Sequence, residues 1–194
     1  MVFNKIKNFS GLKDLTSLGI SNIMSAGISA IFWFYLAGLL GEENYGELSY
    51  LIAIAVIAGV FSSIGSGYTT TVYSAKNVNI MPALSLLSIT ISVIVAVIVY
   101  VLFENISVSL YVIGYVIFNI VQAEMLGKKH YQSYSKITIL QKIFLVSLAL
   151  PIYYVMDSYG IILGLALSFF PFSIFVILKI KKNGIDFSVL KSRF

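Results

Sequence analysis

Residues 92–100 read Ser-Val-Ile-Val-Ala-Val-Ile-Val-Tyr, and this run lies inside an apolar segment that extends from residue 80 to residue 103. Valine and isoleucine also favour strands, but the strands of membrane β-barrels alternate apolar with polar residues over about ten positions. Here the apolar residues follow one another without alternation. Because a backbone surrounded by lipid must form its hydrogen bonds internally, the stretch predicts a membrane-spanning helix.

Five further stretches have the apolar character of a membrane helix, which needs about 20 residues to cross a hydrocarbon core ~30 Å thick. The six predicted helices cover residues 15–40, 48–72, 80–103, 108–126, 137–156 and 161–180. Short polar connections join them, so consecutive helices are expected to be antiparallel. The predicted fold class is therefore an all-α integral membrane protein. It would have an N-terminal arm at 1–14, a six-helix bundle at 15–180 and a basic tail or linker at 181–194.

The composition agrees with this prediction and excludes several classes of site. Hydrophobic residues make up 59% of the chain and charged residues 11%, against roughly 25% charged residues in soluble domains. Cysteine is absent and His130 is the single histidine, which excludes disulfides, thiolate nucleophiles, cysteine-based zinc sites and multi-histidine metal sites. The only acidic pair, Glu42-Glu43, has no histidine or arginine near it. The chain is predicted to be no enzyme and to need neither a metal nor a cofactor.

Lysine and arginine gather in alternate connections. The regions before the first predicted helix, after the second, after the fourth and at the end of the sixth contain Lys5, Lys7, Lys13, Lys76, Lys128, Lys129, Lys136, Lys179, Lys181, Lys182, Lys191 and Arg193. The other connections carry Glu42, Glu43, Glu104 and Asp157. By the positive-inside rule the lysine side is cytoplasmic. This predicts a multi-pass protein of the cell membrane with both termini inside, whose partners include the lipid bilayer and no nucleic acid.

Small polar residues recur every four positions on two of the predicted helices, at Ser17, Ser21, Ser25 and Ser29 and at Ser62, Ser66, Thr70 and Ser74. Residues four apart share one helical face, so each helix presents a polar stripe. Such stripes favour close helix packing, and the alternative is the wall of a hydrated cavity. Gly160 and Gly164 likewise favour packing. Gly65 and Gly67 indicate either a packing notch or a functional bend of the kind that builds transporter sites.

Two ionisable residues fall within predicted spans, Glu124 and Lys142. A charge inside a membrane indicates a functional site unless it is neutralised or reaches the interface. Glu124 is four residues from Lys128 and can pair with it, and Lys142 can extend toward the headgroups. Neutral polar residues, Asn22, Asn119 and Gln122, are expected at a similar depth. Together with Ser25, these residues are the candidates for a substrate cavity.

Four segments resemble a known family of transporters. The sequence Leu-Leu-Gly-Glu-Glu-Asn-Tyr-Gly-Glu-Leu-Ser at 39–49 leads into a long apolar helix and then into Ile-Gly-Ser-Gly-Tyr-Thr-Thr-Thr-Val-Tyr-Ser-Ala-Lys at 64–76. This arrangement resembles polysaccharide-biosynthesis flippases of the multidrug/oligosaccharidyl-lipid/polysaccharide exporter superfamily. Gln-Ala-Glu-Met-Leu-Gly-Lys-Lys-His at 122–130 and Asp-Ser-Tyr-Gly-Ile-Ile-Leu-Gly at 157–164 are similar to two further turns of that family.

The resemblance implies the N-terminal six-helix half of a flippase with twelve or more helices, in which two halves face a central cavity. The implied substrate is a lipid-linked oligosaccharide or polysaccharide precursor. The implied partner is a second six-helix half, from the same gene product or from another chain, so that this chain would be a fragment or a half-sized protein. Many relatives hold a pyrophosphate with cavity arginines. Here the only arginine is Arg193, which leaves Lys76 and Lys142 as the candidate cations.

Two other functions compete with transport. One is an accessory or structural multi-pass membrane subunit without transport of its own. The other is a membrane-embedded lipid enzyme, which would need paired carboxylates, a metal cluster or a nucleophile with its base. The sequence offers none of these combinations, which disfavours the enzyme.

The lysine distribution predicts which connections face outward. Cysteines placed at Asn44 and Asn105 should react with an impermeant thiol reagent added to intact cells, whereas cysteines at Asn77 and Ser133 should react only after the membrane is opened. The natural chain contains no cysteine, so it supplies the unlabelled control. Labelling at Asn77 as strong as at Asn44 would contradict the orientation.

Overall fold

The computed structural model of the chain describes residues 10–185, with side chains from residue 16 onward. Most of the predicted N-terminal arm and the end of the predicted tail lie outside these residues. The predicted cytoplasmic cations Lys5, Lys7, Lys191 and Arg193 therefore lie outside the described part of the chain, as does the side chain of Lys13.

The described chain is helical throughout except for short connections, and it contains no strand between residues 10 and 185. Its elements are α1 (Ser10–Ser63), α2 (Ser66–Ala75), α3 (Met81–Phe103), α4 (Ile106–Gly127), α5 (Tyr131–Leu167), the 3-10 turn η2 (Phe170–Phe172) and α6 (Ser173–Asn183). Four helical segments are long and apolar enough to cross a membrane: Thr16–Ser63, Met81–Phe103, Ile106–Gly127 and Tyr131–Asn183. The all-α prediction is confirmed, and these segments indicate a membrane protein.

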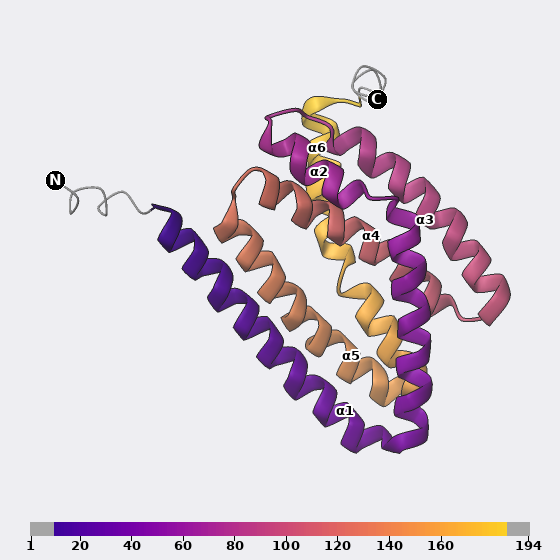
Figure 1. The fold of residues 1–194 in the computed structure, drawn as a ribbon. Helices are drawn as coiled ribbons and strands as arrows, with labels where there is room; N and C mark the ends of the chain where they lie inside the picture. Colours follow the sequence, from indigo (N-terminus) through magenta and orange to yellow (C-terminus); the bar gives the residue numbers. More distant parts are fainter. Residues whose placement is uncertain (1–9, 186–194) are drawn as a thin grey trace.

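Two of the predicted loops are reduced to single residues. Gly41 interrupts α1 with φ 73° and ψ 175°, and Asp157 interrupts α5 with φ 54° and ψ −148°. At each of these residues the chain reverses direction (Figure 1). Glycine adopts a positive φ without strain, and aspartate tolerates it better than most residues. The connection predicted between the helices at 15–40 and 48–72 is thus too long, because the helix resumes at Glu42.

The second arm of α5 packs tightly against the first after the turn at Asp157. A Cβ atom on Gly164 would collide with the backbone of Ala149, and one on Gly160 would lie 3.0 Å from the Ile152 side chain. Glycine at both positions therefore permits the two arms to approach closely. The packing role predicted for Gly160 and Gly164 is confirmed.

Two of the predicted helices are interrupted within their length. The helix predicted at 48–72 breaks at Ile64 and Gly65, whose φ angles are 43° and 69°, and α2 begins at Ser66. The helix predicted at 161–180 breaks at η2, which contains Pro171. Proline has no backbone N–H and clashes with the preceding helical turn, which favours the break there, whereas Pro151 is accommodated inside α5. The bend considered at Gly65 is present.

Helix α4 forms the centre of the bundle. It contacts α1, α2, α3, α5 and α6, and most of its side chains are buried, whereas α1 and α3 are exposed along most of their length (Figure 1). Large apolar side chains such as Ile31 (74% exposed) and Phe34 (80% exposed) cover the outside. A water-soluble protein rarely exposes so much contiguous apolar surface, so this surface is suited to lipid.

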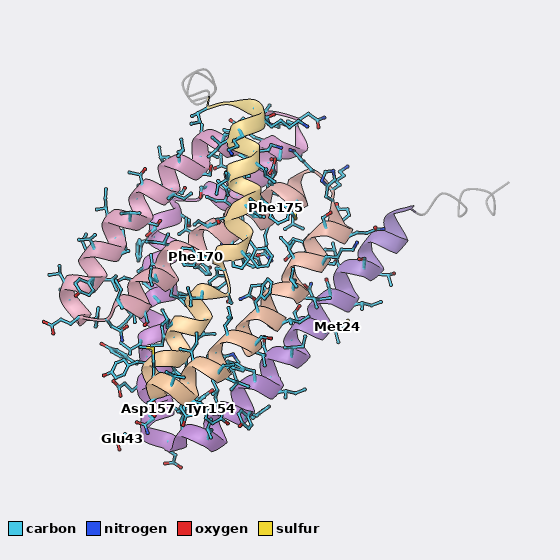
Figure 2. The ribbon with its side chains drawn as sticks, turned by 180° about the vertical axis from the view of Figure 1, so that it is seen from behind. Met24, Glu43, Tyr154, Asp157, Phe170 and Phe175 are labelled. Carbon is cyan, nitrogen blue, oxygen red and sulfur yellow. The ribbon has the colours of Figure 1, made fainter. Side chains whose placement is uncertain are left out.

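The acidic residues Glu43 and Asp157 lie at the opposite end of the bundle from the two described ends of the chain (Figure 2). Toward the described chain ends, the α2–α3 connection meets the end of α6, where the Asn183 side-chain amide donates to the Asn79 side-chain oxygen at 2.9 Å. The lysines that flank these elements, Lys76 and Lys182, thus belong to one end of the molecule.

Asn105 is less suited to labelling than the sequence indicated. It is 8% exposed and caps α4, because its side-chain oxygen accepts from the backbone N–H groups of Ser107 and Val108 at 3.0 and 3.2 Å. The neighbouring Glu104 is exposed and makes the better position for a reporter cysteine.

Close packing of α2 on α4 depends on Gly127. A Cβ atom there would collide with the Thr71 carbonyl oxygen and lie 2.7 Å from the Ser74 Cβ atom, whereas a Cβ atom on Gly27 meets nothing within 4 Å. Gly127→Ala should lower the free energy of unfolding by about 1–3 kcal/mol, the usual cost of overpacking. Gly27→Ala should be neutral or stabilising, because alanine is the better helix former. Thermal denaturation in detergent measures both, and equal effects would contradict the packing role.

Candidate functional site

A polar groove lies between the broken end of α1, α2, α4 and the beginning of α5. Its volume is about 370 Å³. Its lining consists of Val60, Ser63, Gly65, Gly67, Tyr68, Thr71, Tyr115, Asn119, Gln122, Ala123, Leu126 and Tyr134. Polar side chains inside an apolar helix bundle either hydrogen-bond between helices or line a functional path.

The break at Gly65 shapes one wall of the groove. Because α1 ends at Ser63 and α2 begins at Ser66, the chain between them is not in a regular helix. Irregular backbone at membrane depth occurs where it is covered by protein or lines a polar cavity. Thr71 lies on α2 one turn after Gly67. Its hydroxyl donates to the carbonyl oxygens of Gly67 and Ala123 at 3.0 and 3.2 Å. The second of these bonds fixes α2 to α4.

Asn119 and Gln122 form the opposite wall, on α4. A Cβ atom on Gly67 would lie 2.6 Å from the Asn119 side-chain oxygen, so glycine is what lets this amide approach α2. The Gln122 side-chain amide donates to the Thr138 hydroxyl at 2.9 Å, and this hydroxyl donates to the Tyr134 carbonyl oxygen at 2.8 Å. Asn119 is eight residues before the end of α4, or ~12 Å at ~1.5 Å per residue. The groove therefore reaches well into the bundle.

Lys142 lies on α5 two turns beyond Tyr134, and it is not among the residues that line the groove. It is one helical turn beyond Thr138, and residues four apart share a face, so Lys142 continues the surface that contacts Gln122. The side chain is half-buried, and no ion pair to it is found among the described side chains. Lys142 is eleven residues into α5, which corresponds to ~16 Å. Its neighbour Gln141 is buried and donates to the Ser168 hydroxyl at 3.0 Å, which anchors this part of α5 to the end of the same helix, after the turn at Asp157.

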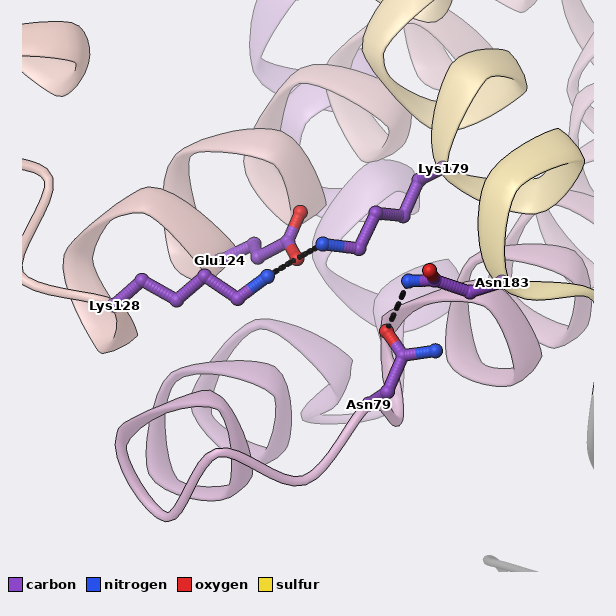
Figure 3. A network of polar contacts seen from close by, with 5 residues as sticks. All are labelled: Asn79, Glu124, Lys128, Lys179 and Asn183. Atoms are coloured by element: carbon purple, nitrogen blue, oxygen red, sulfur yellow. Dashed lines mark hydrogen bonds and ion pairs between the residues drawn. The ribbon is translucent and has the colours of Figure 1, made fainter.

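Glu124 is separated from the groove and is already neutralised. Its Oε1 atom accepts from Lys128 at 2.5 Å and lies 2.6 Å from the Lys179 Nζ atom, as Figure 3 shows. The pairing with Lys128 was predicted from the i,i+4 spacing, and the structure confirms it. The contact with Lys179 was not predicted, because it joins α4 to α6. Glu124 thus faces α6, and Gln122 faces the groove on another side of α4.

The other predicted site residues lie apart from the groove. Ser25 is buried (6% exposed) on the stripe of α1 that faces α5, where Ser17 donates to Ser135 at 3.3 Å. Asn22 is exposed. Lys76 is exposed at the end of α2, with its Nζ atom 5.6 Å from the centre of the Tyr73 ring. The structure therefore brings Asn119 and Gln122 together, places Lys142 on the adjoining helix and leaves Asn22, Ser25 and Lys76 outside.

The stripe on the second predicted helix is buried along its whole length. Ser62, Ser66, Thr70 and Ser74 are each at most 3% exposed. The hydroxyls of Ser66 and Thr70 have no hydrogen-bond partner among the described residues. This stripe faces neighbouring helices rather than the groove, whose α2 residues are Gly67, Tyr68 and Thr71. Of the two alternatives for this stripe, packing is the one that the structure favours.

Comparison of the chain with protein-family models, with curated proteins and with solved structures finds no match.

The ion pairs of Glu124 with Lys128 and Lys179 are expected to stabilise the fold. Glu124→Gln would leave Lys128 and Lys179 close together without a carboxylate between them. Losing a hydrogen-bonded charge of this kind costs about 1–3 kcal/mol of unfolding free energy. Glu43→Gln removes the same charge from an exposed position without an ion pair among the described residues and should leave stability unchanged. Thermal denaturation of both variants in detergent measures the difference, and a stable Glu124→Gln variant would show that the cluster is dispensable.

Proposed function

We propose that this chain is a multi-pass protein of the cell membrane that crosses the bilayer six times, with both termini in the cytoplasm. The segment Thr16–Ser63 has 48 residues and Tyr131–Asn183 has 53. At ~1.5 Å per residue each is more than twice as long as the ~30 Å hydrocarbon core. The reversals at Gly41 and Asp157 divide each segment into two crossings. With the lysine end cytoplasmic, the charges agree with the positive-inside rule.

The function proposed for this bundle is the flipping or export of a lipid-linked oligosaccharide or polysaccharide precursor, as the N-terminal half of a flippase. The observation that carries the proposal is the polar groove between α2 and α4, about 370 Å³ in volume, within a largely apolar bundle. Its amide, hydroxyl and tyrosine groups suit the hydroxyl-rich headgroup of such a precursor. The family resemblance of 39–49 and 64–76 supports the same substrate class.

In this mechanism the headgroup enters the groove while the lipid tail stays in the bilayer. Asn119 and Gln122 offer hydrogen-bond donors and acceptors that replace the water lost by the sugar. Lys142 supplies a cation for the phosphate that links sugar and lipid, and a partly desolvated ammonium binds phosphate more strongly than one in bulk water. Broken helices build the substrate sites of many transporters, and the break at Gly65 is of that kind.

A complete cavity requires a second six-helix half, from the same gene product or from a partner chain. Alternating access then follows when one half rocks against the other around the bound headgroup. No covalent bond forms or breaks in this cycle, so the proposed function needs neither catalytic residues nor a cofactor.

Lys142→Gln tests the proposal in cells whose own copy of the gene is deleted. The fraction of lipid-linked glycan that an impermeant glycosidase can reach reports flipping. We expect at least a tenfold loss with Lys142→Gln at an unchanged amount of protein in the membrane, because the variant lacks the cation that we assign to the phosphate of the precursor. Lys136→Gln is the matched control, since Lys136 is an exposed lysine of the same helix.

Normal flipping by Lys142→Gln would show that Lys142 extends to the interface and does not hold the substrate. If deletion of the gene leaves the accessible fraction unchanged, the transport proposal itself is wrong. An accessory subunit would then be the better assignment if the deletion instead removes another membrane protein from the cell.

A further inference from the structure

A second hollow lies on another side of α4, at the lysine end of the bundle. Its volume is about 340 Å³, and α4, α5 and α6 surround it. The polar part of its lining consists of Glu124, Lys128, His130, Ser133, Lys179 and Lys182, and the apolar part of Val121, Met125, Phe175 and Leu178. It shares no lining residue with the groove between α2 and α4.

The polar part carries an excess of positive charge. Lys128 and Lys179 both contact the same oxygen of Glu124, at 2.5 and 2.6 Å, and their side chains remain 27% and 20% exposed (Figure 3). Lys182 adds a third ammonium group without an ion pair among the described residues. Three lysines against one glutamate leave two positive charges uncompensated. Each ammonium has three N–H donors, so most of the donors around the hollow stay available to an anion.

The apolar part continues from the charged end into the bilayer region. Phe175 and Leu178 are 40% and 56% exposed and lie on α6 one turn or less from Lys179, toward the middle of the bundle. Figure 2 shows Phe175 on this part of α6. An exposed apolar strip that begins directly beneath a cluster of lysines has the two-part chemistry of a phospholipid, which joins an anionic phosphate to an acyl chain.

We infer that this hollow binds an anionic phospholipid of the leaflet at the lysine end, with its phosphate among Lys128, Lys179 and Lys182 and an acyl chain along Phe175 and Leu178. Basic pockets between membrane helices recognise anionic headgroups through charge, and hydrogen bonds from ammonium groups to phosphate are among the strong ones. The Glu124 carboxylate holds two of the ammonium groups in place before the lipid arrives. The inference does not depend on the proposed transport.

The experiment uses the full chain purified in detergent, with native mass spectrometry to count bound lipids at equal additions of dioleoyl-phosphatidylglycerol or dioleoyl-phosphatidylcholine. We expect phosphatidylglycerol to bind several-fold more strongly. Lys182→Gln should weaken that binding about fivefold, the effect expected for one lysine near a membrane surface. Lys181→Gln is the matched control, because Lys181 is an exposed neighbour that does not line the hollow. Phosphatidylcholine binding checks that each variant is folded.

Three other outcomes would each contradict the assignment of this hollow to a phospholipid. Equal binding of the two lipids would show that the charge cluster does not select headgroups. Equal losses from Lys181→Gln and Lys182→Gln would show that general surface charge, and not this hollow, attracts the lipid. Displacement of phosphatidylglycerol by millimolar inorganic phosphate would identify a site for a free phosphate rather than for a phospholipid.

Discussion

Lipid offers no hydrogen-bond partner to a peptide group, and the architecture of this protein follows from that constraint. All regular structure in residues 10–185 is helical, and very few of these residues lie outside helices. The turns at Gly41 and Asp157 each use one residue with a positive φ, so almost every backbone group on either side stays within a helix. Where helical bonding lapses at Gly65, the chain lines the polar groove, and in the 3-10 turn before α6 Phe172 packs against Phe118 and Phe144.

The helical class and the apolar segments were predictable from the sequence because they depend only on the local run of apolar residues. The interruption at Pro171 was harder to predict: proline disfavours a continuous helix, but Pro151 lies inside α5 without ending it, so the residue type alone does not locate a break. The sequence did not predict that the turn after residue 40 would contain a single non-helical residue. Glu42 and Asn44 have the composition of a loop, yet the chain needs only Gly41 to reverse, and the helix resumes directly after it.

In the candidate site, too, contacts within one helix were predictable and contacts between helices were not. The i,i+4 pair of Glu124 with Lys128 depends on helical spacing alone and was predicted correctly. The contact with Lys179 depends on how α6 crosses α4, which no local pattern reveals. In the same way, Asn119 and Gln122 were recognisable as polar residues in an apolar segment. The packing of four helical segments determines the rest of the groove, and the sequence does not reveal that packing. Gly67 leaves room for the Asn119 side chain, and Tyr115 and Tyr134 complete the lining.

The single-residue turns have a consequence for recognition by other molecules. At the acidic end of the bundle, helices α1 and α5 reverse within one residue, so no extended loop stands clear of the headgroups there. A protease needs several residues of extended chain in its cleft, and an antibody needs a patch of comparable size. This end of the protein offers neither, apart from the few side chains around Glu42, Glu43 and Asp157.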